Sequence, residues 1–225
     1  MRIVFLSWFL IVVMIFACAQ QRSKEDKPQW LFPDDQVLLR SAGSGFSSAT
    51  ELPLETIYER KGVTLEEGRT GCPERVDEVQ AAGPLWLAAM LGRKAKIQST
   101  GAPNRDTVLE SRGALLLSVK FYARKKDTQT DIELWQDDHK YQPASKHVNR
   151  EDNLGCKFSS APLLENSPGD FRYRVEQAFV FRFEPTENAD WDRSFRLVLR
   201  RTDGRVEEYV VSFADAFTRQ ARKIR

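Results

Sequence analysis

The sequence predicts a mainly β protein, an antiparallel β-sandwich with short helices in its N-terminal part and a C-terminal helix. Apolar and polar residues alternate with a period of two through much of residues 107–225, as expected for strands with one buried face. Turn-forming residues separate these stretches at short intervals. The chain has 225 residues, enough to bury a sizeable core.

The first element, residues 1–17, has the composition of an export signal. Arg2 provides a short positive region, and residues Ile3 to Ala17 carry no charged side chain. As a helix this run would be about 22 Å long, shorter than the roughly 30 Å of a hydrocarbon core. It therefore matches the apolar region of a signal peptide. An uncleaved anchor or an ordinary secretory signal are the alternatives, and either would also export the chain.

The end of this run resembles the signal of bacterial lipoproteins. Its residues are Ile15, Phe16, Ala17 and Cys18, and only Phe16 is bulkier than the pattern prefers. The resemblance covers the first 18 residues. It implies cleavage before Cys18, acylation of this cysteine with chains such as palmitate, and a lipid-anchored location in the bacterial cell envelope. Ala19, which is not acidic, favours the outer membrane over the inner membrane by the sorting behaviour of that class.

The rest of the chain divides into a tether and one domain. Residues 18–29 join the cysteine to a polar, charged stretch without apolar periodicity, which predicts a flexible tether. Residues 30–225 are predicted to form a single β-rich domain. Its part over 30–106 is mixed and helical, and its part over 107–225 is rich in strands.

The cysteines predict one disulfide. The chain has 3 Cys, and if Cys18 is acylated, Cys72 and Cys156 remain. An even pair in an exported chain indicates a disulfide bond. Closing so long a loop would stabilise the fold by about 4–5 kcal/mol in the chain-entropy model. Two free, buried thiols are the alternative.

The N-terminal half of the domain has weaker patterns. Residues 36–40 predict a first strand, and the Ser- and Gly-rich stretch that follows predicts a loop. Apolar residues at helical spacing predict a helix over 54–61 and another over 73–92. The Gly83-Pro84 pair is expected to interrupt the second helix.

The C-terminal half contains the clearest strands. One predicted strand turns four apolar residues to one face: Leu115, Leu117, Val119 and Phe121. Residues 131–136 predict a second strand, and residues 171–185 predict a third with an irregularity at 176–178. Arginines alternate with the aromatic residues of the third strand, and they recur in the stretch FRLVLRR at 195–201, as on a solvated opposite face.

A hairpin and a helix are expected to end the chain. Residues 194–213 predict the hairpin, because Asp203-Gly204 tolerates positive φ at both turn positions. Residues 214–225 predict an amphipathic helix with one apolar stripe.

A metal site has weak candidate ligands. Asp137, Asp138, His139, His147 and Asp152 could supply nitrogen and oxygen ligands. Their spacing matches no metal-binding motif, and polar residues are usual in an exposed loop. The sequence therefore predicts no metal and no cofactor.

No catalytic residue emerges from the sequence. Serine elbows and phosphate-binding loops are absent, and adjacent carboxylates such as Glu207 and Glu208 point to opposite faces of a strand. The formal net charge of +2 argues against nucleic-acid binding. The sequence predicts a non-catalytic, lipid-anchored lipoprotein that binds or scaffolds an envelope protein or cell-wall partner. The alternative is an envelope hydrolase that acts on glycan or peptide through carboxylates.

Overall fold

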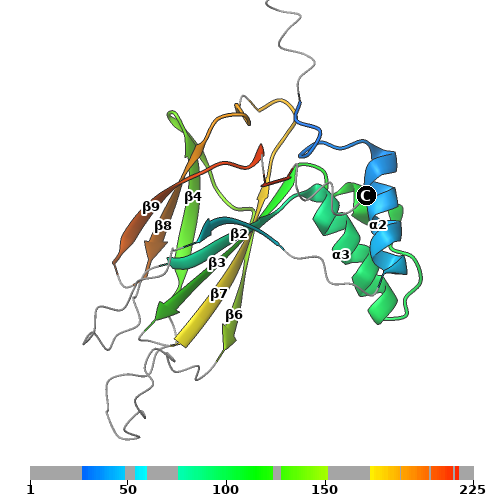
Figure 1. Ribbon diagram of the computed structural model, residues 1–225, viewed down its shortest axis with the longest axis horizontal. Coiled ribbons are helices and arrows are strands. Elements are labelled where there is room, and N and C mark those ends of the chain that lie inside the picture. The colour runs from blue at the N-terminus through cyan, green and yellow to red at the C-terminus, as the bar shows by residue number, and fades with distance from the viewer. Residues whose placement is uncertain are drawn as a thin grey trace, which may run out of the picture.

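Two antiparallel sheets and a group of helices beside them make up the computed structural model (Figure 1). The predicted fold class, a mainly β sandwich, is confirmed. No described helix is both long enough and apolar enough to span a membrane. The structure describes residues 27–48, 54–59, 76–123, 128–151, 173–187, 189–202, 204–214, 216 and 217. The helices are α2 (Asp35–Ser47), α3 (Pro84–Ile97) and α4 (Arg105–Leu109).

The strands are distributed over a larger and a smaller sheet. In order across the larger sheet they are β1 (Glu55–Glu59), β2 (Val76–Ala82), β3 (Ala114–Ala123), β7 (Tyr173–Arg182) and β6 (Ser145–Glu151). In order across the smaller sheet they are β5 (His139–Tyr141), β4 (Thr130–Gln136), β8 (Phe195–Arg201) and β9 (Val206–Val211).

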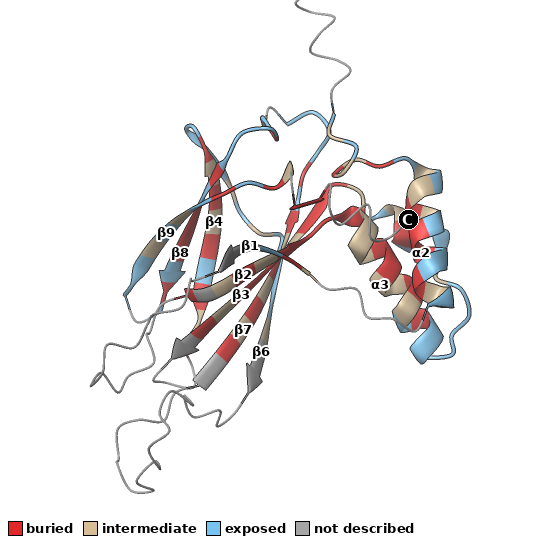
Figure 2. Cartoon of the chain, in the orientation of Figure 1, coloured by how far each residue is buried: buried red, intermediate tan, exposed pale blue. Residues whose placement is uncertain are grey.

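The main core lies between the two sheets, where the buried faces of their strands meet (Figure 2). The predicted inward face of β3 is confirmed, because all four of its apolar residues are buried. In β4, Ile132 and Leu134 are buried while Glu133 and Trp135 are half-buried, as the alternation predicts. Apolar residues of β7 and β8 complete this core.

Strand β7 runs without the predicted irregularity. Its pairing with β3 is continuous from Tyr173 to Arg182. Gln177 occupies the inward position between Val175 and Phe179 and is fully buried. The prediction of an irregularity at 176–178 was wrong. A polar residue on the buried face interrupts the alternation of apolar and polar residues in the sequence, just as an irregular strand would.

The predicted strand at 36–40 and the loop predicted for the Ser- and Gly-rich stretch after it were wrong, because residues 36–40 and 41–47 are both part of α2. Leu38, Ala42 and Gly45 are buried along one face of this helix, and this face packs on α3. Ser41 Oγ donates a hydrogen bond to the Leu85 carbonyl of α3 at 2.7 Å. The prediction failed because QVLLR is short, and short apolar runs fit strand and helix equally well.

The two predicted helices that follow are also wrong where the structure describes them. Residues 55–59 form β1, and the first part of 73–92 forms β2, so that only the part after Gly83 is helical. A β-bulge lies between Val76 and Glu78 in the pairing of β2 with β3. Because a bulge adds one residue to its strand, Val76 and Val79 are both buried, and their spacing imitates a helix.

The C-terminal hairpin is confirmed as β8 and β9. The two strands pair from Phe195 with Val211 to Arg200 with Val206. Gly204 has φ +87°, which glycine adopts at little cost, whereas Asp203 lies outside the described residues. Of the predicted C-terminal helix only the start is described, where the Phe217 amide donates to the Phe213 carbonyl at 3.0 Å.

The sandwich has two distinct ends. At the first, which we call the Trp30 end, Trp30 stacks on Phe217 with ring centroids 4.7 Å apart, and the Gly113 amide donates to the Leu31 carbonyl at 2.8 Å. We call the second the Val76 end. Here four neighbouring strands, β2, β3, β7 and β6, each contribute one residue to a row of paired residues across the larger sheet: Val76, Phe121, Val175 and Arg150. Residues 27–33 thus join the sandwich at one end, whereas the connections between β1 and β2 and between β6 and β7 start from the other.

Candidate binding groove

Helices α2 and α3 pack with their backbones in close contact. A Cβ atom on Gly45 of α2 would lie 1.9 Å from the Ala89 carbonyl oxygen, and one on Gly92 of α3 would lie 1.9 Å from the Ala42 carbonyl oxygen. Only glycine fits at either position, because a Cβ atom there would overlap backbone atoms. The small residues of α3 therefore face α2, and four of its large apolar residues, Leu87, Met90, Leu91 and Ile97, line a groove elsewhere.

These large residues line a groove between α3 and the larger sheet. The groove, which we call the α3 groove, has a volume of about 550 Å³, within the usual range of ligand sites. Its apolar wall consists of Leu87, Met90, Leu91, Ile97, Ala114 and Val180. Its other lining residues are Arg93, Lys94, Gln98, Thr107, Glu110, Ser111 and Arg182.

Cations outnumber anions around the α3 groove. Arg93, Lys94 and Arg182 contribute three positive charges, and Glu110 is the one carboxylate in the lining. Arg182 Nη1 donates a hydrogen bond to the backbone carbonyl of Glu110. Arg93 Nη1 is buried and has no hydrogen-bond partner among the described residues. The groove therefore combines an apolar wall with a surplus of hydrogen-bond donors and positive charge.

The outer part of this wall is exposed to solvent. Ile97 is 71% exposed, and Leu87, Met90 and Leu91 are half-buried. Within the described part of the chain, no element covers this face of α3, which contacts β2 and β3 only slightly. The uncovered apolar residues beside the groove make this face a candidate site of interaction.

The candidate metal ligands do not converge. Asp137 and Asp138 form the turn between β4 and β5, and exposed His139 follows them. His147 lies on β6, in the other sheet. No group of three or more possible metal ligands occurs in the described ranges, and Asp152 lies outside them.

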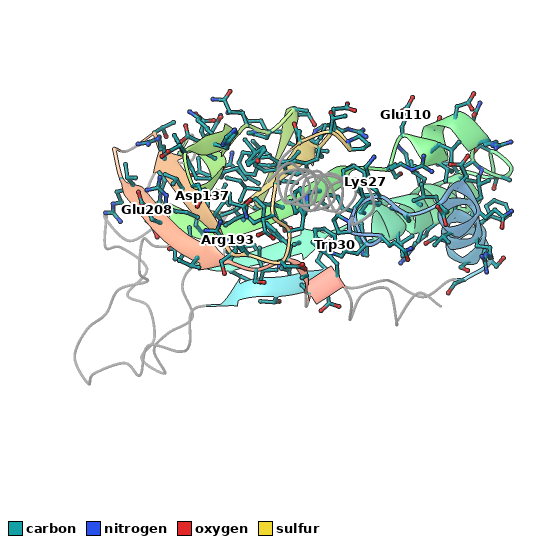
Figure 3. All side chains as sticks on the ribbon, turned by 90° about the horizontal axis from the view of Figure 1, so that it is seen from above. Lys27, Trp30, Glu110, Asp137, Arg193 and Glu208 are labelled. Carbon is teal, nitrogen blue, oxygen red and sulfur yellow. The ribbon has the colours of Figure 1, made fainter. Side chains whose placement is uncertain are left out.

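Asp137 is engaged by an arginine instead. Its two carboxylate oxygens accept hydrogen bonds from Arg193 at 3.0 and 2.9 Å. In Figure 3 these two labelled residues lie on the side of the sandwich away from Glu110 and the helices. The pair closes the β4–β5 turn against the segment before β8, so its role here is structural.

Trp135 of the smaller sheet, whose ring contacts two cationic side chains, was not selected from the sequence. The Trp135 ring lies between Lys140 Nζ, 5.6 Å from its centroid, and the Arg196 guanidinium, at 5.3 Å. Burial acts to raise the pKa of Glu133, but hydrogen bonds from Lys140 and Trp135 and the charge of Arg200 outweigh it and hold that pKa below its usual value. This cluster pairs its own charges and leaves only a shallow hollow beside it.

The adjacent carboxylates at the chain end point apart, as predicted. Glu207 is turned inward, where its Oε2 accepts from the Val76 amide at 3.2 Å and from the Tyr209 hydroxyl. Glu208 is exposed and lies 3.5 Å from Arg196 on the outer face. They do not form a pair across a cleft.

One arginine of this region is buried rather than solvated. The side chain of Arg201 is 1% exposed, and its Nη1 lies 3.7 Å from Glu207 Oε1. Its guanidinium also lies over the Phe121 ring, 4.6 Å from the centroid. The expectation of arginines on a solvated face holds for Arg196 and Arg200, which are exposed, but not for Arg201.

None of the described residues selected from the sequence lines the α3 groove. Cys18, Cys72 and Cys156 lie outside the described residues, and the carboxylates and histidines lie on other surfaces. The signal present in the sequence was the apolar run LWLAAML, but a run alone does not show which of its residues lack a neighbour. No protein-family model matches this chain, and no curated protein matches its sequence.

Proposed function

We propose that the chain is a lipid-anchored lipoprotein of the bacterial cell envelope whose sandwich domain binds an envelope ligand or partner in the α3 groove, without catalysis. The observation that carries the binding role is the groove itself. Its apolar wall and its volume are those of small-ligand sites, and the polar and charged residues around the wall could orient a ligand. The outer membrane is the favoured location, on the basis of the residue after Cys18.

The anchor is supported by the residues around Cys18 and by the course of the chain that follows. Several acyl chains on one cysteine would hold the protein stably, since each buried CH₂ contributes about 0.8 kcal/mol. The described chain begins at Lys27 and enters the core through Trp30 and Leu31. A tether of residues 18–29 would therefore attach at the Trp30 end and leave the helices beside the sandwich accessible.

The Cys72–Cys156 disulfide is supported by the register of the larger sheet. Cys72 precedes Val76 by four residues, and Cys156 follows Glu151 by five. Val76 and Glu151 both lie at the Val76 end, with β3 and β7 between their strands, a separation of about 14 Å at the usual strand spacing. Nine residues of extended chain span roughly 30 Å, so the two cysteines can meet.

The non-catalytic role is supported by the lining of the groove. Glycoside hydrolysis by carboxylates needs two carboxyl groups about 5–10 Å apart across the substrate. Glu110 is the one carboxylate in the groove lining, and the other described carboxylates discussed above do not line this groove. The hydrolase alternative therefore gains no support from this site.

Two measurements in cells test the proposal. The Cys18→Ser variant should lose the acylated form and leave the membrane fraction, and retention at unchanged size would contradict the anchor. A photo-crosslinking amino acid placed at Ile97 should capture a ligand or partner. The same amino acid at Val210, which is 76% exposed on the smaller sheet, is the matched control, and equal capture at both positions would contradict binding in the groove.

A further inference from the structure

We infer that the α3 groove binds a fatty acid, with its alkyl chain along the apolar wall and its carboxylate among the cations of the rim. The inference rests on the proposed function, because it names the ligand class of that same site. Three properties of the groove carry it: its apolar wall, its surplus of positive charge and its size.

The apolar wall suits an alkyl chain. Leu87, Met90, Leu91 and Ile97 present four flexible or branched side chains along one face of α3, opposite Val180 of the sheet. Covering them removes apolar surface from water at about 25 cal/mol per Å². Methionine adapts its shape to irregular apolar ligands, so the wall does not require a ligand of one fixed outline.

The surplus of positive charge selects an anionic head group. Arg93, Lys94 and Arg182 face one carboxylate, Glu110, in the lining. Arg93 Nη1 is buried without a partner in the described structure, and a buried polar donor without a partner is costly. A carboxylate would accept hydrogen bonds from guanidinium groups in the geometry that they prefer.

The size of the groove separates the fatty acid from larger occupants. An α-helix with its side chains is about 10–12 Å across and rises 5.4 Å per turn, so two turns fill roughly 900 Å³. The groove holds about 550 Å³, so two turns of a partner helix could enter it only in part. One alkyl chain with a single head group fits the space and the charge together.

The experiment uses the full chain in phospholipid nanodiscs and photoreactive twelve-carbon probes. A diazirine-bearing dodecanoic acid is compared with the corresponding alcohol and quaternary ammonium, and labelling is mapped by peptide mass spectrometry and normalised to the nanodisc scaffold protein. We expect the acid to label the groove-lining peptides of α3 and β7 at least tenfold more than the ammonium probe does. Unlabelled dodecanoate should compete.

Charge variants identify the head-group site. Arg93→Gln should lower labelling by the acid about tenfold, the effect of losing one charge-assisted hydrogen bond. Lys94→Glu should lower it at least as much, because it also places a negative charge in the groove lining. Lys96→Glu is the matched control, because Lys96 lies on the same helix but donates to the Ser47 carbonyl of α2 at 2.9 Å. The melting temperature of Arg93→Gln should not fall, since Nη1 has no described partner to lose, whereas a purely structural role would lower it.

Three outcomes would overturn the inference. Equal labelling by the acid, alcohol and ammonium probes would show an apolar site without preference for an anion, and would leave the proposed binding function standing. If the probes do not label the groove but a protein is captured at Ile97 in cells, the occupant of the groove is a protein partner and not a fatty acid. Absence of both signals would reject the fatty acid and the proposed function together.

Discussion

The side-chain carbonyl of Gln177, on the larger sheet, accepts a hydrogen bond from the backbone amide of Thr130, on the smaller sheet, at 2.6 Å. Both residues are buried, and Gln177 is fully so. Gln177 Nε2 has no partner among the described residues. The side chain of Gln177 therefore links the two sheets through a hydrogen bond inside the core.

The Gln177→Leu variant should lower the free energy of unfolding by about 1–3 kcal/mol, because the Thr130 amide would be left buried without its acceptor. Urea unfolding of the purified full chain measures the change. Gln142→Leu, at an exposed position between β5 and β6, is the control and should change stability by less than about 0.5 kcal/mol. A Gln177→Leu variant as stable as the parent would show that the hydrogen bond contributes nothing net.

Alanine at Gly45 or at Gly92 should separate α2 from α3, because the new Cβ atom would overlap a backbone carbonyl oxygen. We expect each variant to lose about 1–3 kcal/mol, as for overpacked sites, and to disturb the α3 groove. Gly43→Ala is the control in the same helix, where no atom lies within 4 Å of the added Cβ. That variant should gain up to about 1 kcal/mol, since alanine is the better helix former.

Glu78 should make stability depend on acid pH. Burial acts to raise its pKa, but hydrogen bonds from Lys120, Thr56 and Gln80 outweigh it and hold the pKa below its usual 4.5. A carboxyl group whose pKa is lowered on folding stabilises the protein above its unfolded pKa, and this contribution is lost as the pH falls through the folded value. The parent should therefore weaken below about pH 4.5.

The Glu78→Gln variant should lose less stability than the parent between about pH 5 and about pH 3, measured by urea unfolding at each pH. Lys120→Gln should also make the free energy of unfolding depend less on pH in this range, because the 3.0 Å hydrogen bond from Lys120 Nζ to Glu78 Oε2 would be absent. If both variants show the same dependence of unfolding free energy on pH as the parent, other carboxyl groups cause the loss of stability in acid.

The Cys72–Cys156 bridge should be measurable in the exported protein. Its intact mass without reductant should be about 2 Da below the reduced mass, reflecting the loss of two hydrogens. The double variant Cys72→Ser, Cys156→Ser should lower the free energy of unfolding by about 4 kcal/mol. Labelling of both thiols by a maleimide in the unreduced, denatured protein would contradict the bridge.

Part of this architecture could be predicted because its patterns are local. Strands β3, β4, β8 and β9 alternate along their own sequences, and the turn at Gly204 depends on adjacent residues. Each of these elements buries one face of its own residues, so the period of two is visible without knowledge of its partners. The signal around Cys18 is local in the same sense, and it remains a prediction.

The N-terminal elements depended on partners that are distant in the sequence. Residues 36–40 are helical because α2 packs on α3 through Gly45 and Gly92, a contact that no short window contains. Residues 76–82 form a strand because β2 pairs with β3, and its bulge gave Val76 and Val79 a helical spacing.

The sequence by itself determined the mainly β class, the inward faces of the central strands and the hairpin turn, because these follow from alternation over a few neighbouring residues. Tertiary structure alone decided the helix at 35–47, the strands at 55–59 and 76–82, and the α3 groove. A groove is the space that distant elements leave uncovered. Its apolar wall and cations come from α3, β3 and β7, which meet only when the chain has folded.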